Sequence, residues 1–146
     1  MGQPPKSAVA TSYHRQQLQR YVCLAYACLI TYVSLAPGQR IPGIFDWGQL
    51  FSPDKVAHFG AYAIFAVLLS FSIRASSVRK QAATAAAAAT LFGVLMEVLQ
   101  GVAGTGRDFD PVDMVANLIG SVLGGFIFLA LHHFVDKYFT TLKSQQ

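Results

Sequence analysis

Four apolar stretches constrain this chain more than any other feature of its sequence. They cover about residues 20–36, 56–73, 82–99 and 112–135. A helix that crosses a bilayer needs roughly 20 mostly apolar residues, and inside lipid only helices and closed barrels satisfy their backbone hydrogen bonds. The third stretch is weakly apolar and inserts best beside neighbours. The pattern therefore predicts an all-α fold, a compact four-helix transmembrane bundle.

The composition agrees with a membrane environment. The chain is 53% hydrophobic and only 12% charged, whereas a soluble domain carries about 25% charged residues. So few charges do not cover a water-facing surface. The net charge of +4 is typical of loops that face anionic lipid headgroups, and no nucleic-acid-binding motif accompanies it. We therefore expect membrane lipid as a partner and exclude nucleic acid.

Turn and capping residues delimit the spans. "SPD" at residues 52–54 and "DP" at residues 110–111 each place an N-cap residue before a proline, which marks a helix start. The polar stretch of about 20 residues before the first span is long for a signal peptide, so we expect that span to be retained rather than cleaved. The predicted domains are a polar N-terminal cytoplasmic segment, a membrane domain and a cytoplasmic tail, at residues 1–19, 20–135 and 136–146.

The distribution of basic residues predicts the orientation, because Lys and Arg accumulate in cytoplasmic loops. Eight of the 11 lie before span one, between spans two and three, or after span four: Lys6, Arg15, Arg20, Arg74, Arg79, Lys80, Lys137 and Lys143. The other three are Arg40, Lys55 and Arg107. This split predicts an inner (plasma) membrane protein with both termini in the cytoplasm.

The acidic residues show the opposite bias. All but Asp136 lie on or near the predicted outer side: Asp46, Asp54, Glu97, Asp108, Asp110 and Asp113. The polar chemistry of the chain is therefore predicted to face the periplasm or the cell exterior.

Helical spacing gathers polar side chains at the outer ends of three spans. Residues three or four apart share one helix face. By this rule, one face of span two carries a carboxylate, an imidazole and a phenol. Spans three and four each carry an acid and an amide. The loop between spans three and four carries a guanidinium. These residues are Asp54, His58 and Tyr62, then Glu97 and Gln100, then Asp113 and Asn117, with Arg107 in the loop.

Glu97 is the most informative of these residues. It lies within an apolar span, between Met96 and Val98. An ionisable residue at membrane depth costs at least about 2–3 kcal/mol on insertion scales, so it faces the bundle interior and has a partner. His58, Lys55 and Arg107 are the expected partners. Alternatively, Asp54 and Asp113 only stabilise the starts of their helices. The cluster is then a structural clasp, a set of polar contacts that holds the helices together.

Small residues in the spans are predicted to serve packing. Gly120 and Gly124 have the G-x-x-x-G spacing that allows helices to approach closely, and we expect them to bring spans three and four together. Cys23 and Cys28 are five apart, and no second Cys/His pair completes a metal site. Both are predicted to be small buried residues.

Three segments then resemble the blocks of the VanZ-like family. They are "DKVAHFGAYAIFAVLL", "LFGVLMEVLQ" and "GRDFDPVDMVANLIGSVLGG", within residues 54–125. Members of that family are small bacterial membrane proteins named for a factor associated with glycopeptide (teicoplanin) resistance. The resemblance implies a cell-envelope role and no particular reaction. Many relatives have a small polar residue where this chain has "DFDPV". The polar positions of the family motifs correspond here to Asp54, Lys55, His58, Tyr62, Glu97, Gln100, Arg107, Asp113 and Asn117.

The cluster supports three functional hypotheses. The first is an enzyme that acts on a lipid or lipid-linked envelope precursor, with His58, Glu97 and Asp54 in acid–base roles and the ligand-binding residues Lys55, Tyr62, Gln100, Arg107, Asp113 and Asn117. A divalent metal held by Asp54, His58, Glu97 and Asp113 is a variant of it. The second is a non-enzymatic binding, accessory or structural subunit of a membrane complex. The third is a component of an oligomeric transporter. A role in glycopeptide susceptibility remains a hypothesis, and the cofactor is unknown.

Overall fold

The computed structural model describes residues 6–36, 52–104 and 109–143, and these residues form four α-helices. The helices are α1 (Lys6–Leu35), α2 (Pro53–Ser72), α3 (Val78–Val102) and α4 (Pro111–Lys143). Each contains a segment that is long and apolar enough to cross a membrane. The prediction of an all-helical chain with four candidate spans is confirmed.

The first and last helices extend well beyond the predicted spans. α1 begins at Lys6, within the segment predicted as a polar N-terminal extension, and α4 continues to Lys143, within the predicted tail. Neither Gly nor Pro occurs between Lys6 and Leu35, so nothing in the sequence breaks the first helix. Hydropathy locates the apolar part of a helix, whereas its backbone hydrogen bonds continue into polar sequence.

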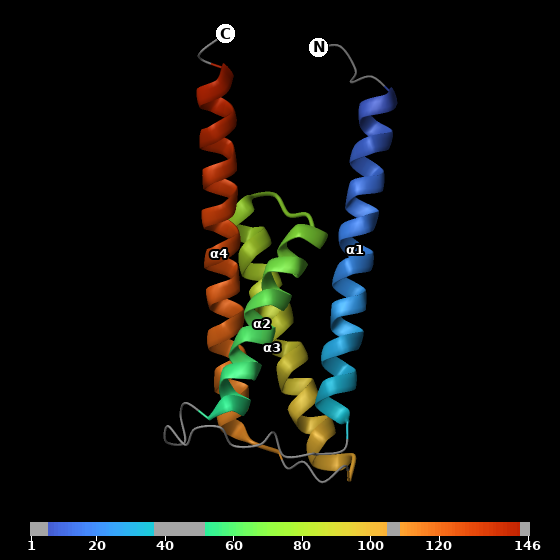
Figure 1. Ribbon diagram of the computed structural model, residues 1–146, viewed down its shortest axis with the longest axis vertical. Coiled ribbons are helices and arrows are strands. Elements are labelled where there is room, and N and C mark those ends of the chain that lie inside the picture. Colours follow the sequence, from blue (N-terminus) through green and yellow to red (C-terminus); the bar gives the residue numbers. More distant parts are fainter. Residues whose placement is uncertain (1–5, 37–51, 105–108, 144–146) are drawn as a thin grey trace.

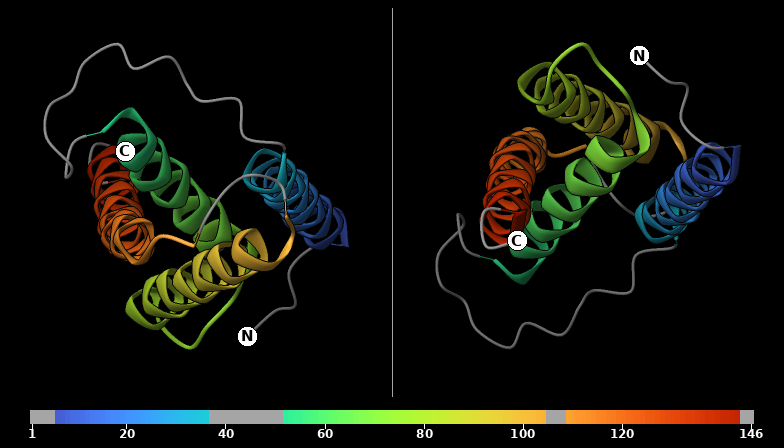
Figure 2. Two further views of the ribbon diagram at one scale, coloured as in Figure 1. Left: turned by 90° about the horizontal axis from the view of Figure 1, so that it is seen from below. Right: turned by 90° about the horizontal axis from the view of Figure 1, so that it is seen from above.

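The four helices form a bundle with α2 at its centre. α2 and α3 pack against α4 on one side, and α1 packs against α2 and α3 on the other (Figures 1 and 2). The start of α1, the end of α4 and the connection between α2 and α3 lie on the same side of the bundle, and α1 and α4 extend beyond that connection (Figure 1). The start of α2, the end of α3 and the start of α4 therefore meet at the opposite end.

An aromatic core joins the first three helices. Phe65 of α2 stacks against Phe92 of α3 and Tyr26 of α1, with ring centroids 5.2 and 6.2 Å apart. The Tyr26 hydroxyl donates a hydrogen bond of 3.2 Å to the carbonyl oxygen of Ala61. Large apolar residues cover the outside, for example Leu91 at 70% exposed and Phe126 at 64%. An apolar exterior of this kind suits a lipid environment.

The two cysteines differ in their surroundings. Cys23 lies in the core between α1 and α2, whereas Cys28 is exposed on the outer face of α1. The prediction that both are buried was therefore wrong for Cys28. A spacing of five residues turns the second side chain away from the core, and in lipid an exposed thiol needs no polar partner.

Glycines allow α4 to touch the backbone of α2. A Cβ atom at Gly120 would overlap the carbonyl oxygen of Phe59, and one at Gly124 would overlap that of Ala63. The G-x-x-x-G pair was expected to join spans three and four, and it instead forms the contact of α4 with α2. Gly125, the next residue, faces Ala82 of α3. The close α2–α4 contact brings the polar starts of both helices together.

Candidate functional site

The polar site lies where α2 and α4 begin and α3 ends. Both helices start with proline, and both carry an acid in the first turn, Asp54 in α2 and Asp113 in α4. Asp110 caps α4, because its Oδ1 accepts a hydrogen bond of 2.8 Å from the Val112 N–H. Acids at these positions offset the exposed N–H groups and the dipole of a helix start. Ordinary helix-start chemistry thus supplies three carboxylates to one end of the bundle.

Lys55 links the two helix starts. Its Nζ lies 2.8 Å from Oδ2 of Asp110 and 3.0 Å from Oδ1 of Asp113. The lysine side chain is 12% exposed and that of Asp113 only 8%, so little water competes with the second ion pair. Lys55 was predicted as a partner of Glu97, and it instead bridges two acids of α4.

The ion pair with Lys55 also sets the acid behaviour of Asp110. The Lys55 ammonium, followed by the hydrogen bond from the Val112 N–H, lowers the pKa of Asp110 below its ordinary value. A carboxyl whose pKa is lower in the folded state stabilises the fold above its unfolded pKa, and this contribution disappears as the pH falls through the folded pKa.

We therefore expect the melting temperature of the detergent-purified protein to fall below about pH 4, the ordinary pKa of Asp. Asp110→Asn removes this part of the acid sensitivity. The side chain of Asp110 is 40% exposed, so the effect amounts to less than about 1 kcal/mol. Thermal melts between pH 3 and pH 7 measure it. Identical acid profiles for the wild type and Asp110→Asn would contradict the assignment.

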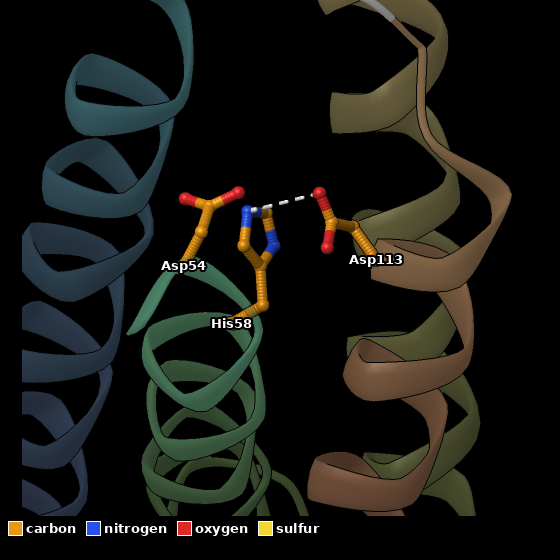
Figure 3. Close-up of side chains that lie close together, drawn as sticks. All are labelled: Asp54, His58 and Asp113. Atoms are coloured by element: carbon orange, nitrogen blue, oxygen red, sulfur yellow. Dashed lines mark ion pairs between the residues drawn. The ribbon is translucent and has the colours of Figure 1, made fainter. Parts of the chain in front are cut away.

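The imidazole of His58 lies among oxygen atoms on all sides. Its Nδ1 is 3.1 Å from Oδ1 of Asn117 and 3.7 Å from Oε1 of Glu97. Its Nε2 is 3.9 Å from Oδ2 of Asp113. Figure 3 shows the ring between the carboxylates of Asp54 and Asp113. One ligand atom from each of Asp54, His58 and Asp113 lies within 4.8 Å of the others.

Within the described part of the chain, several buried polar atoms near His58 have no hydrogen-bond partner. They are Oε1 of Glu97, Nδ2 of Asn117 and the hydroxyl of Tyr62. Glu97 and Asn117 are fully buried, and Tyr62 is 1% exposed. The other oxygen of Glu97 accepts only a long hydrogen bond, 3.4 Å, from the Asp110 N–H. The site therefore holds both donors and an acceptor that the described residues leave unpaired.

Comparison with known protein families identifies the family of this chain. A family model described as VanZ/LLP1 matches residues 5–132. The chain belongs to the VanZ/LLP1 family. Neither a curated protein nor a solved structure matches it. The matched range contains every residue of the polar site, and the VanZ-like resemblance expected from three sequence segments is confirmed. The chain is a multi-pass membrane protein with four candidate spans.

Gly93 forms one wall of the site in this VanZ/LLP1 protein. A Cβ atom there would stand 2.9 Å from Cβ of Asn117 and 3.0 Å from Cε1 of Tyr62. α3 therefore approaches both side chains more closely than any other residue type allows. This contact places the unpaired groups of α2 and α4 side by side, next to the helix that carries Glu97.

One of the predicted site residues lies apart from this arrangement. Gln100 is buried, and its Nε2 donates a hydrogen bond of 2.9 Å to the carbonyl oxygen of Ser34 in α1. It thus connects the C-terminal ends of α3 and α1. Arg107 lies outside the described residues. The remaining predicted residues, on α2, α3 and α4, come together: Asp54, Lys55, His58, Tyr62, Glu97, Asp113 and Asn117.

Asp110 is the site residue that the sequence reasoning missed. It was recognised only as a helix cap, whereas it also pairs with Lys55 and donates its backbone N–H to Glu97. A usable signal was present, because Asp110 and Asp113 are three residues apart at a helix start and one cation can reach both.

Proposed function

We propose that this VanZ/LLP1 protein binds the polar headgroup of a lipid or lipid-linked cell-envelope component at the cluster of polar residues around His58. The observation that carries the proposal is the group of three unpaired buried atoms on Tyr62, Glu97 and Asn117. An unsatisfied buried polar group costs about 1–3 kcal/mol. A purely structural clasp gains nothing from this cost, whereas a binding site recovers it when a ligand supplies the partners.

The unpaired atoms also favour a class of headgroup. The Glu97 oxygen accepts a hydrogen bond, while the Asn117 amide and the Tyr62 hydroxyl donate. Hydroxyl groups match all three, because each can both donate and accept. Lys55 Nζ already bonds two carboxylates, which leaves one of its three N–H donors for a ligand phosphate. The described residues therefore support recognition of a hydroxyl-rich headgroup, such as a sugar or a polyol.

The proposed orientation places this cluster on the outer side of the membrane. Eight of the 11 basic residues belong to segments at the opposite end, the end at which α1 starts and α4 finishes (Figure 1). Basic residues favour the cytoplasmic side. Both termini are then cytoplasmic, and the polar cluster lies at the periplasmic or exterior side.

Cysteine labelling tests the orientation. In a background of Cys23→Ala and Cys28→Ala, we expect a membrane-impermeant maleimide to label Ser52→Cys at the start of α2 in intact spheroplasts. The matched variant Ser76→Cys, in the connection between α2 and α3, should react only after the membrane is opened. Labelling of Ser76→Cys alone in intact spheroplasts would reverse the proposed orientation.

Lipid analysis tests the proposed function itself. The protein is purified in mild detergent, and the lipids that remain bound are extracted and quantified by mass spectrometry. We expect at least one species with a hydroxyl-rich headgroup to be enriched over the bulk membrane, and Asn117→Ala to reduce it at least tenfold. Ser70→Ala serves as the control, because Ser70 is buried in α2 and its hydroxyl donates to the Ala66 carbonyl of its own helix. The same lipid profile in all three proteins would contradict headgroup binding.

Acid–base catalysis on the bound headgroup is a second candidate function. The observation that favours it is the position of the His58 ring, with Glu97 and Asp113 at its two nitrogens. A histidine oriented by a carboxylate is a common general base. Incubating the extracted lipid with the protein tests this candidate: catalysis requires a mass change that His58→Ala and Glu97→Gln both abolish. A binding protein tolerates the isosteric Glu97→Gln change and produces no new mass.

A further inference from the structure

The neighbours of His58 constrain its protonation. Both groups beside Nδ1 are oxygens, of Asn117 at 3.1 Å and Glu97 at 3.7 Å. Both oxygens can accept a hydrogen bond from an Nδ1–H group. The other nitrogen, Nε2, faces the carboxylates of Asp54 and Asp113 (Figure 3). Carboxylates at this nitrogen are satisfied either by an Nε2–H group that donates to them or by a metal cation held between the three side chains.

The groups around this set already have the arrangement of a metal site. A metal-binding histidine usually donates its other ring N–H to an oxygen acceptor, which fixes the ring and its tautomer. The Asn117 side chain supplies that acceptor. Asp113 uses Oδ1 for Lys55, while its Oδ2 is the oxygen nearer to Nε2. The fully buried and unpaired Oε1 of Glu97 points at the same ring, which is an observation independent of the carboxylate cluster.

We propose that Asp54, Nε2 of His58 and Asp113 bind a divalent transition-metal ion, of which Zn²⁺ is the best match. Imidazole and carboxylate are ordinary zinc ligands, and sites with three protein ligands keep a fourth position open. A tetrahedral Zn²⁺ with ligands at about 2.1 Å holds them about 3.4 Å apart. The three ligand atoms lie within 4.8 Å of one another. Zinc binding therefore requires them to move closer together by about 1 Å.

The structure also revises the ligand set suggested by the sequence. Glu97 was included among the four metal candidates, but it lies beside Nδ1, on the other edge of the ring from Asp113. Glu97 and Asn117 are therefore positioning residues that orient His58, and the ligands are the remaining three.

The metal gives the headgroup site an anion-binding position. Lys55 is held by two acids, whereas the open position of the ion accepts a phosphate oxygen or a water molecule. The inference rests on the proposed function only for this role in headgroup recognition. Metal binding itself is measured without lipid, so either proposal can fail while the other stands.

The test is a zinc titration of the purified protein. The full chain, carrying a tag without histidine, is treated with a chelator in detergent and titrated with ZnCl₂ by isothermal calorimetry. We expect saturation at one ion per chain, with the affinity reduced at least tenfold by His58→Gln and by Asp113→Asn. His132→Gln is the matched control, because His132 also faces an acid, Asp136 at 2.9 Å, but near the far end of α4. This control should bind zinc as the wild type does.

Three results would overturn the metal site: no saturable binding by the wild type, unchanged binding in His58→Gln, or equal loss in His132→Gln. Thermal melts report whether each variant is folded. Asp113→Asn also loses an ion pair with Lys55, and if it does not fold, the wild type and His58→Gln decide the question. Lipid enrichment without zinc binding contradicts the metal site alone, and zinc binding without lipid enrichment contradicts the proposed function alone.

Discussion

Gly120→Ala is expected to prevent the accumulation of folded protein, while Gly60→Ala leaves it unchanged or slightly more stable. A Cβ atom at position 120 would overlap the backbone carbonyl of Phe59, and a backbone group does not rotate away as a side chain does. This overlap is relieved only if α2 and α4 move apart. Overpacking costs about 1–3 kcal/mol where side chains can adjust, so we expect a larger loss at this backbone contact.

Gly60 is the matched control because it also lies within the membrane domain, on α2. Among the described residues, no atom beyond its chain neighbours and the nearby backbone of its own helix lies within 4 Å of a Cβ added there, and alanine favours the helix by about 1 kcal/mol over glycine. Yield and melting temperature after detergent purification measure both variants. Similar melting temperatures for Gly120→Ala and the wild type would show that the α2–α4 crossing is less close than described.

Glu97→Met is expected to raise the melting temperature and to remove ligand binding. The change replaces a fully buried carboxyl that has one unpaired oxygen by an apolar side chain of similar length. Removing an unsatisfied buried group increases the free energy of unfolding by about 1–3 kcal/mol. Replacing a residue that is kept for function often makes a protein more stable. We expect the enrichment of the bound lipid to fall at least tenfold.

Gln100→Met is the matched control for this prediction. Gln100 lies three residues further along α3 and is also buried, but its amide is paired with Ser34 of α1. Its replacement should lower the melting temperature, since it removes a buried hydrogen bond between helices and leaves a carbonyl oxygen unpaired. A lower melting temperature for both variants, with lipid binding retained in Glu97→Met, would identify the cluster as a structural clasp.

Spacing within helices predicted much of the site. Asp54 and His58 are four apart, as are Asp113 and Asn117, and each pair contributes to the same cluster because helical periodicity is a local property. The buried position of Glu97 also followed from its place in an apolar span. The family resemblance added the expectation that these separate segments belong together, and the VanZ/LLP1 match confirms the family.

Contacts between helices were harder to predict, because they depend on which faces pack. Lys55 was assigned to Glu97, yet it reaches Asp110 and Asp113 because α4 lies directly against α2. The same contact explains Gly120, whose motif indicates close approach but not the helix that approaches. Gln100 was grouped with the site by its spacing from Glu97, and the arrival of α1 beside it gives it another partner.

A crystallographic map of the wild-type protein in a lipidic mesophase tests the central claim most directly. If the cluster is a ligand site, the map contains non-protein density within hydrogen-bonding distance of Oε1 of Glu97 and the hydroxyl of Tyr62. The opposite result is a cluster in which those two atoms bond to other groups of the protein and no further density is present. That result would contradict the account and leave the cluster as a clasp that holds three helices together.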